Sequence, residues 1–189
     1  MVPVPTAEMR AQDPAFILAE PYKELPVGKT NFKGEVPEIV GMTAYDSFDV
    51  FSARKLYLHN CGHAILAYLG ALRGHSSSCE AFDDPFIAKA VKTAMAESAA
   101  GIAKAFNADP AWLSAHVEDL LSRFANKPLG DSVARIGRDP LRKLQPEDRL
   151  VGAARLAENA GVRPESLALG IAAALLFESP DDKAALEFK

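Results

Sequence analysis

The stretch Arg54–Gly70 reads RKLYLHNCGHAILAYLG, and its apolar residues recur at helical rather than strand spacing. On a wheel of about 100° per residue, one apolar stripe is formed by Leu58, Cys61, Ile65, Tyr68, Leu69 and Leu72. The stripe predicts a helix that buries one face. This helix is expected from Ser47 to about Arg73, with Asp46 or Ser47 as its N-cap and Gly74 as its stop.

The sequence beyond this stretch is helical as well. Prolines just inside two predicted starts, Pro85 and Pro110, favour helix initiation there. The predicted helices are Asp84–Phe106, Asp109–Phe124, Pro146–Ala160 and Pro164–Phe177, with a loop and short helix over 125–145 and an amphipathic tail over 181–188. Because Pro164–Phe177 is almost entirely apolar, we expect it to be buried. Glu97 is interpreted as part of an exposed helix face.

Residues 1–45 differ in character, since six prolines and three glycines interrupt them and exclude long helices. Phe16–Glu20 and Asn31–Phe32 are predicted as short strands around a turn at Pro26–Thr30. Such a hairpin is not stable alone, so we expect it to extend or pack against another sheet. The predicted fold is mainly α: an irregular helical bundle over 46–189 with a small N-terminal β extension over 1–45.

Composition narrows the class of protein. The 189 residues are 49% hydrophobic and 24% charged, which is ordinary for a globular protein, and the net charge of −4 gives no bulk attraction to nucleic acid or anionic membrane. Two cysteines indicate no disulfide framework, and the first ten residues do not resemble a secretory signal. A cytoplasmic location is therefore expected. Neither GxGxxG nor GxxxxGK[ST] occurs, so no Rossmann-type nucleotide domain is predicted.

The other side of the Arg54–Gly70 helix is polar. With Lys55 at zero, His59 falls near about 40°, His63 near about 80° and Asn60 near about 140°. Gly62, Leu66 and Gly70 lie on this side. The absence of a side chain at the two glycines leaves room for a ligand or a closely packed backbone. A lysine can act as a general base on an alcohol, and an asparagine amide can donate to the resulting oxyanion.

Two simpler interpretations of this polar face stay open. The first is an ordinary solvated helix surface. The second is a metal site at His59 and His63, four residues apart, but no carboxylate or cysteine pair completes a ligand set, and no metal is predicted.

Lys55, Asn60 and His63 form a K-x4-N-x2-H arrangement, and this motif resembles the signature of the polyol-specific long-chain dehydrogenases, the mannitol dehydrogenase family. The segments Lys55–Gly70, Arg123–Leu150 and Gly170–Phe177 are similar to its mannitol-1-phosphate 5-dehydrogenase branch. The similarity runs from about Val2 to the C-terminus. It implies a helical domain like the C-terminal domain of 6-phosphogluconate dehydrogenase relatives, following a Rossmann domain that this chain lacks.

The resemblance implies roles for these residues. Lys55 matches the general base, Asn60 the group that hydrogen-bonds the reacting oxygen, and His63 a substrate contact that helps to hold the lysine. The implied reaction is metal-independent hydride transfer between a polyol carbon and NAD, which is bound mainly by the missing domain. His59 and Cys61 depart from the family pattern and are interpreted as neighbours of the site. A further asparagine of the family's site lies upstream and is absent, so the chain alone is expected to be inactive.

Five basic residues lie close together in a chain that is acidic overall: Arg135, Arg138, Arg142, Lys143 and Arg149. Guanidinium groups bind phosphate oxygens well. A surface loop whose basic residues pair with nearby acidic residues would show the same sequence pattern. The resemblance favours Arg138, Arg142 and Lys143 as contacts to a polyol phosphate or sugar phosphate. Mannitol 1-phosphate and fructose 6-phosphate are the expected pair.

Two other functions remain open. The chain could be a sugar-phosphate-binding module that pairs with a separate dinucleotide-binding domain, or an interaction protein without catalysis. An apolar surface exposed where the other domain docks would favour self-association.

Overall fold

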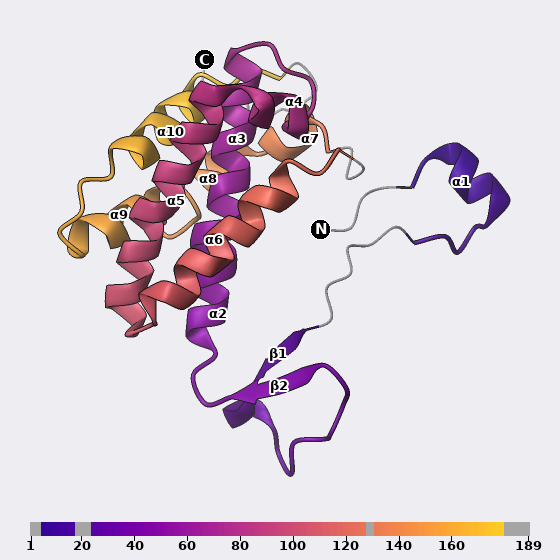
Figure 1. Cartoon of the computed structure of the whole chain (residues 1–189), viewed down its shortest axis with the longest axis vertical. Helices are drawn as coiled ribbons and strands as arrows, with labels where there is room; N and C mark the ends of the chain where they lie inside the picture. Colours follow the sequence, from indigo (N-terminus) through magenta and orange to yellow (C-terminus); the bar gives the residue numbers. More distant parts are fainter. Residues whose placement is uncertain (1–4, 18–23, 128–130, 180–189) are drawn as a thin grey trace. The chain divides into compact units, whose positions relative to one another are not determined.

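The computed structural model describes residues 5–17, 24–127 and 131–179. It divides into two units: the first comprises the residues up to Phe48 together with Lys127, and the second comprises Asp49–Asn126 and the residues from Asp131 onward. Figure 1 shows the short N-terminal elements and the helices of the second unit. Across the described residues, none of the helices is both long and apolar enough to cross a membrane. The predicted tail at 181–188 lies outside the described residues.

The first unit holds a two-stranded sheet, but its strands differ from those predicted. Helix α1 (Ala7–Gln12) is followed by β1 (Leu25–Gly28), a 3-10 turn η1 (Lys29–Asn31) and β2 (Met42–Tyr45). The strands pair in parallel, with Leu25 opposite Met42. The predicted hairpin is wrong in its second half: Pro26 lies inside a strand, Asn31 belongs to η1, and Phe32 follows it. Of the other predicted strand, Phe16–Glu20, residues 18–20 lie outside the described residues. Residues 29–41 give the connection that parallel pairing requires, since a tight turn joins only antiparallel strands.

The second unit is a bundle of helices. Its elements are α2 (Asp49–Ala53), the π-helix η2 (Arg54–Asn60), α3 (Cys61–Leu72), α4 (Ser78–Asp83), α5 (Pro85–Phe106), α6 (Pro110–Phe124), α7 (Val133–Gly137), α8 (Pro140–Lys143), α9 (Val151–Asn159) and α10 (Glu165–Leu175). The mainly helical prediction with a small N-terminal β element is confirmed.

The starts of the longer helices follow the predicted capping. Asp84 caps α5 by accepting from the amide of Phe86 at 2.9 Å, and Asp109 caps α6 by accepting from that of Ala111 at 2.9 Å. Ser77 and Glu80 form a capping box at α4, a helix that was not predicted. Each cap satisfies an amide that the first helical turn leaves unpaired.

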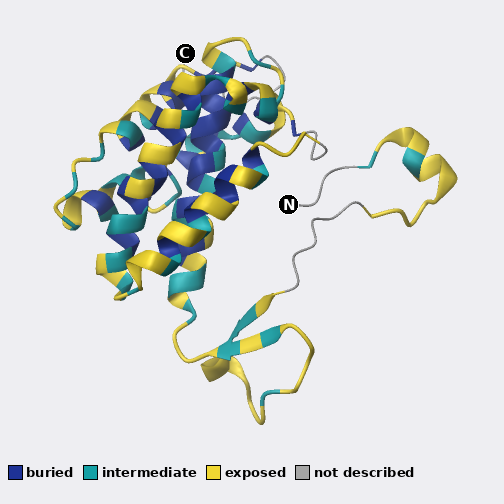
Figure 2. Ribbon diagram, in the orientation of Figure 1, coloured by how far each residue is buried: buried dark blue, intermediate teal, exposed yellow. Residues whose placement is uncertain are grey.

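Helix α3 lies at the centre of the unit and contacts α4, α5, α7 and α10 (Figure 1). All but one of the residues Cys61–Gly70 are buried, and His63 is the exception. Figure 2 shows α3 mostly in the dark blue of buried residues. Leu66, which was placed on the polar side, is fully buried, whereas Leu72 of the predicted stripe is 49% exposed. The one-faced helix is therefore wrong for α3, because neighbouring helices cover it on several sides.

The glycines of α3 serve packing. A Cβ at Gly62 would lie 2.6 Å from the Met95 sulfur, and a Cβ at Gly70 would lie 2.8 Å from the Ala81 Cβ. Both distances are too short for real side chains, so the glycines let α4 and α5 approach closely. Of the two alternatives for these glycines, the closely packed backbone is the correct one.

Two further expectations about burial are wrong. Helix α10 is not buried all round, since Leu169, Leu175 and Leu176 are exposed. Glu97 is not on an exposed face: it is 8% exposed, and its carboxylate accepts from the amides of Ser166 and Leu167 at 3.0 and 2.9 Å. These are first-turn amides of α10, so Glu97 joins α5 to α10.

Candidate active site

The K-x4-N-x2-H residues lie where the predicted regular helix becomes a π-helix. Lys55 and Asn60 belong to η2, and His63 lies in the first turn of α3. Backbone hydrogen bonds in a π-helix run from residue i to i+5, and such segments are frequent at functional sites. The wider turn brings residues five apart onto one face. The π-helix therefore turns Asn60 toward the side of Lys55, although the α-helical wheel separates them.

Contacts from other helices hold η2. The Ser98 hydroxyl of α5 donates to the Tyr57 carbonyl at 2.7 Å, and the Tyr57 hydroxyl donates to the Glu147 carbonyl at 3.1 Å. At the start of η2, the Arg54 guanidinium carbon lies 4.3 Å from the centre of the Trp112 ring. Cation–π contacts of this kind are favourable, and more so when they are desolvated. Helices α5 and α6 thus fix both the middle and the beginning of η2.

The exposed Lys55 contacts a buried histidine. Its Nζ lies 3.0 Å from Nδ1 of His59, whose side chain is only 6% exposed. Burial, and next the positive charge of Lys55, lower the pKa of His59 to about 2. His59 is therefore a neutral imidazole near neutral pH. The interpretation of this residue as a mere neighbour missed its direct contact with Lys55.

His63 is held between an aromatic ring and a carboxylate. Its ring stacks on Phe124 with centroids 5.3 Å apart and planes 10° from parallel, and its Nε2 lies 3.8 Å from an Asp131 oxygen. Burial lowers the pKa of His63 to about 4, while the Asp131 charge opposes that change. Asp131 also pairs with Arg135 of α7. This arrangement fixes the ring, which is largely neutral at neutral pH, at the edge of a cleft.

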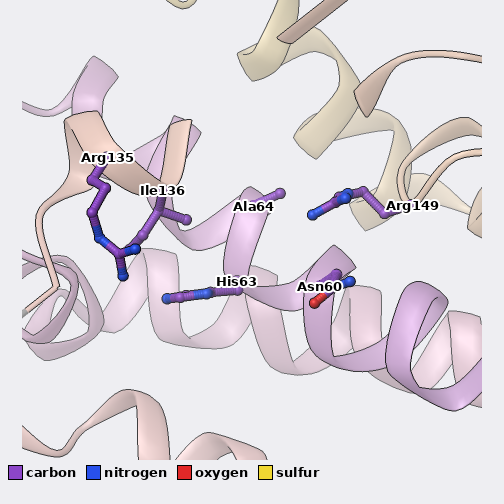
Figure 3. A pocket seen from close by; sticks show the side chains of 6 residues that line it. All are labelled: Asn60, His63, Ala64, Arg135, Ile136 and Arg149. Atoms are coloured by element: carbon purple, nitrogen blue, oxygen red, sulfur yellow. The ribbon is translucent and has the colours of Figure 1, made fainter. Parts of the chain in front are cut away.

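Asn60 and His63 line one small cleft of about 130 Å³. Its other lining residues are Ala64, Arg135, Ile136 and Arg149. Figure 3 shows the Arg135 guanidinium pointing toward the His63 ring and the Arg149 side chain pointing inward from the opposite side. An amide, an imidazole and two cations around one cleft can bind a polyhydroxy or anionic ligand.

A second, larger cleft of about 470 Å³ shares three of these residues. Arg135, Ile136 and Arg149 line both, and the larger cleft adds Arg138, Asp139, Arg142 and Lys143. The three basic residues singled out from the sequence therefore lie at one place. Sequence reasoning did not select Arg135 and Arg149, although these two connect the basic cluster to Asn60 and His63.

The three basic residues have different surroundings. Arg138 is exposed, and its Nε donates to the Arg135 carbonyl at 3.4 Å. The Arg142 Nε lies 2.6 Å from an Asp139 oxygen. Lys143 is 4% exposed; its ammonium donates to the Ile136 carbonyl and lies 5.5 Å from the Tyr68 ring centre. Arg138 and Arg142 are thus both exposed to solvent, whereas Lys143 is buried.

Within the described ranges, no three residues among His, Cys, Asp and Glu are arranged to hold a metal ion. His59 and His63, considered together as a metal pair, have ring centroids 6.3 Å apart, and His59 is bonded to Lys55.

Comparison with known proteins relates this geometry to a family. The sequence model of the mannitol dehydrogenase C-terminal domain matches residues 47–189. The fold resembles the structure of Pseudomonas fluorescens mannitol 2-dehydrogenase in a ternary complex with NAD and D-mannitol, with a TM-score of 0.72 and 22% identity. It also resembles D-sorbitol dehydrogenase in substrate-free form, with a TM-score of 0.71 and 22% identity.

These two structures are much longer than the part that matches. The first alignment covers 100% of this chain and 41% of the mannitol 2-dehydrogenase chain, and the second covers 93% and 37% respectively. At this identity, the likeness shows a shared fold over the matched part.

Proposed function

The chain belongs to the mannitol dehydrogenase family, as a copy of its C-terminal domain, and from this premise we propose that it is the substrate-binding and catalytic part of an NAD-dependent polyol oxidoreductase. The observation that supports this most is the cleft at which Asn60 and His63 meet Arg135 and Arg149, beside the helical turn that carries Lys55. The reaction interconverts a polyol and its ketose by hydride transfer.

The residues suit the proton side of this reaction. Lys55 takes the proton from the reacting hydroxyl in the oxidative direction and returns it in reduction. The Asn60 amide donates to the oxygen as charge develops on it. His63, neutral and fixed by Phe124 and Asp131, hydrogen-bonds a neighbouring hydroxyl. The positive charge of Lys55 acts on His63, which lines the cleft, and we propose that a substrate seated against Asn60 has its reacting oxygen within reach of Lys55.

NAD, when bound, supplies the hydride acceptor. The buried glycines at 62, 70 and 101 lie against protein atoms and offer no cradle for a pyrophosphate. We therefore propose that the dinucleotide is held mainly by a separate Rossmann-type domain, and we assign no cofactor contact to this chain.

We propose a phosphorylated substrate, mannitol 1-phosphate and fructose 6-phosphate, because the larger cleft concentrates guanidinium groups in an acidic chain. Arg138 makes the first contact with the phosphate, and Arg142, already oriented by Asp139, makes the second. Lys143 contributes positive charge from the buried wall of the cleft, since its ammonium donates a hydrogen bond to the Ile136 carbonyl.

Calorimetric titration of the chain with fructose 6-phosphate and with fructose tests the substrate class. We expect weak binding of the phosphate ester and at least about tenfold weaker binding of fructose, because a charge-assisted contact contributes about 1.5–3 kcal/mol. Arg138→Gln should remove most of this preference, whereas Arg163→Gln, a matched change at an exposed ion pair on Glu165, should leave it intact. Equal binding of both sugars would exclude the phosphate site.

Absorbance of NADH in the presence of fructose 6-phosphate tests the assignment as part of an enzyme. The chain alone should give no turnover, and addition or fusion of a matching nucleotide-binding domain should restore it. Phosphate binding without turnover in the completed protein would support the binding-module alternative instead.

A further inference from the structure

Lys55 and His59 form a direct hydrogen bond inside the π-helix, with Nζ and Nδ1 3.0 Å apart. In an α-helix, residues four apart lie on neighbouring turns, and a long lysine side chain normally extends from that surface into water. In η2, the lysine nitrogen lies instead against a ring that belongs to the interior of the bundle. The contact joins the proposed base to a side chain that the surrounding helices hold.

His59 itself has little freedom to move. Its side chain is 6% exposed, and its ring lies 6.2 Å from the Phe124 ring and 6.3 Å from the His63 ring, measured between centroids. The charged and titratable groups that act on it are Lys55 on its own helix, His63 on α3 and Arg123 on α6. All three disfavour a second proton on the ring, as does burial.

A neutral imidazole with its proton on Nε2 has a lone pair on Nδ1 that accepts a hydrogen bond. Lysine can donate that bond both as an ammonium and as an amine, because each form carries at least one N–H. The contact therefore persists while Lys55 gives and takes a proton. The remaining hydrogens, or the lone pair, of Nζ are then directed away from His59.

We propose that His59 is a positioning residue, whose buried ring fixes the Lys55 amino group through the Nζ–Nδ1 hydrogen bond. This inference rests on the proposed function for its catalytic consequence, but the contact is testable without turnover. A general base gains from being held at one geometry, because misplacement by about 1 Å can cost about 100-fold in rate.

The first test is the pH dependence of lysine acetylation in the full chain, by short acetic anhydride pulses read residue by residue with mass spectrometry. Wild type is compared with His59→Leu, which removes the acceptor, and with His59→Asn, whose Oδ1 lies as many bonds from Cβ as Nδ1 and restores an acceptor. Exposed Lys89 on α5 is the internal reference. We expect the midpoint of Lys55 reactivity to fall by about 0.5–1 pH unit in His59→Leu, because the ammonium loses an acceptor. His59→Asn should recover most of this shift.

An unchanged Lys55 midpoint in His59→Leu, or an equal shift at Lys89, overturns the proposal. Thermal unfolding checks that each variant is folded. If His59→Leu does not fold, His59→Phe replaces it, because its ring has a similar shape and no nitrogen acceptor.

The second test uses the protein completed with a nucleotide-binding domain. There, kcat should fall by about 10–100-fold in His59→Leu while KM stays within about threefold, since orientation rather than substrate binding is lost. His59→Asn should restore most of kcat. A fall in kcat that Asn does not rescue overturns the positioning role. If the acetylation result holds but the completed wild type has no turnover, the proposed function fails and the Lys55–His59 contact stands.

Discussion

Helices η2 and α3 follow one another without a break, yet they differ in almost every physical respect. The π-helix has an exposed lysine, half-buried side chains and contacts to both α5 and α6. Helix α3 is buried on several sides, and its glycines touch neighbouring helices. On the proposed function, one helical run separates two tasks: η2 carries Lys55, the proposed base, and α3 keeps η2 in place.

The largest expected effect is that of Lys55→Met in η2, and it should act mainly on turnover rather than on stability. In the completed enzyme, loss of the proposed general base should lower kcat by about 10²–10⁴-fold. The free energy of unfolding should fall by only about 0.5–1.5 kcal/mol, because Lys55 is exposed but the buried His59 loses its hydrogen bond. Steady-state turnover and urea unfolding measure the two quantities. Survival of turnover within a few-fold would show that another group is the base.

A cavity in α3 should have the opposite effect, acting mainly on the free energy of unfolding. Leu66→Ala removes a fully buried side chain and should cost about 2–5 kcal/mol in unfolding free energy. Leu72→Ala, the same change at a half-exposed position of the same helix, should cost at most about 1 kcal/mol. Denaturant unfolding of the pair tests the burial of α3. Similar losses at both positions would contradict it.

A smaller effect is expected from Tyr68→Phe. The Tyr68 hydroxyl donates to the Gly137 carbonyl at 2.9 Å within the core. Removing it leaves that carbonyl unpaired and should cost about 1–2 kcal/mol. Affinity for fructose 6-phosphate should be unchanged, because α3 supports the cleft from below. A large loss of affinity with full stability would place Tyr68 in the site rather than under it.

The smallest expected effect is a loss of stability on mild acidification, and it involves one histidine in η2 and one in α3. The pKa of His59 is lowered to about 2 and that of His63 to about 4 in the folded chain, from 6.5. As the pH falls below about 6.5, the unfolded chain takes up protons that the folded chain refuses, so stability decreases. Urea unfolding from pH 7.5 to 6 should show this decrease. His59→Gln should weaken the pH dependence, as should His63→Gln, and an unaltered slope in both would exclude these histidines as its source.

Local signals predicted much of the fold. Helices α5 and α6 begin within a residue of their predicted starts, because Asp84–Pro85 and Asp109–Pro110 carry the capping information within a few residues. The β1–β2 pairing was missed because it depends on contacts across the connection at 29–41 rather than on a turn motif. The exposure of Leu169 and the burial of Leu66 depend equally on what the other helices cover.

The site was predicted in part. The motif and the resemblance indicated Lys55, Asn60 and His63, and the structure places the last two on one cleft. No residue type in RKLYLHN distinguishes a π-helix from an α-helix, so the wheel misplaced Asn60 relative to Lys55. Selection of Arg135 and Arg149 from the basic cluster required the packing of α7 and the segment before α9 against α3. The spacing of these residues along the chain carries no such information.

The carboxylate of Glu97 also bears on the order in which the bundle assembles. It accepts from amides 69 and 70 residues further along the chain. During synthesis, α5 is complete long before those amides exist. Until they are made, the Glu97 carboxylate lacks these two hydrogen-bond donors. The first turn of α10 becomes stable only when the chain returns to that group, and closing a loop of this length slows folding. Docking of α10 is therefore expected to be a late step, and until then the charge of Glu97 should keep its side of α5 hydrated and open.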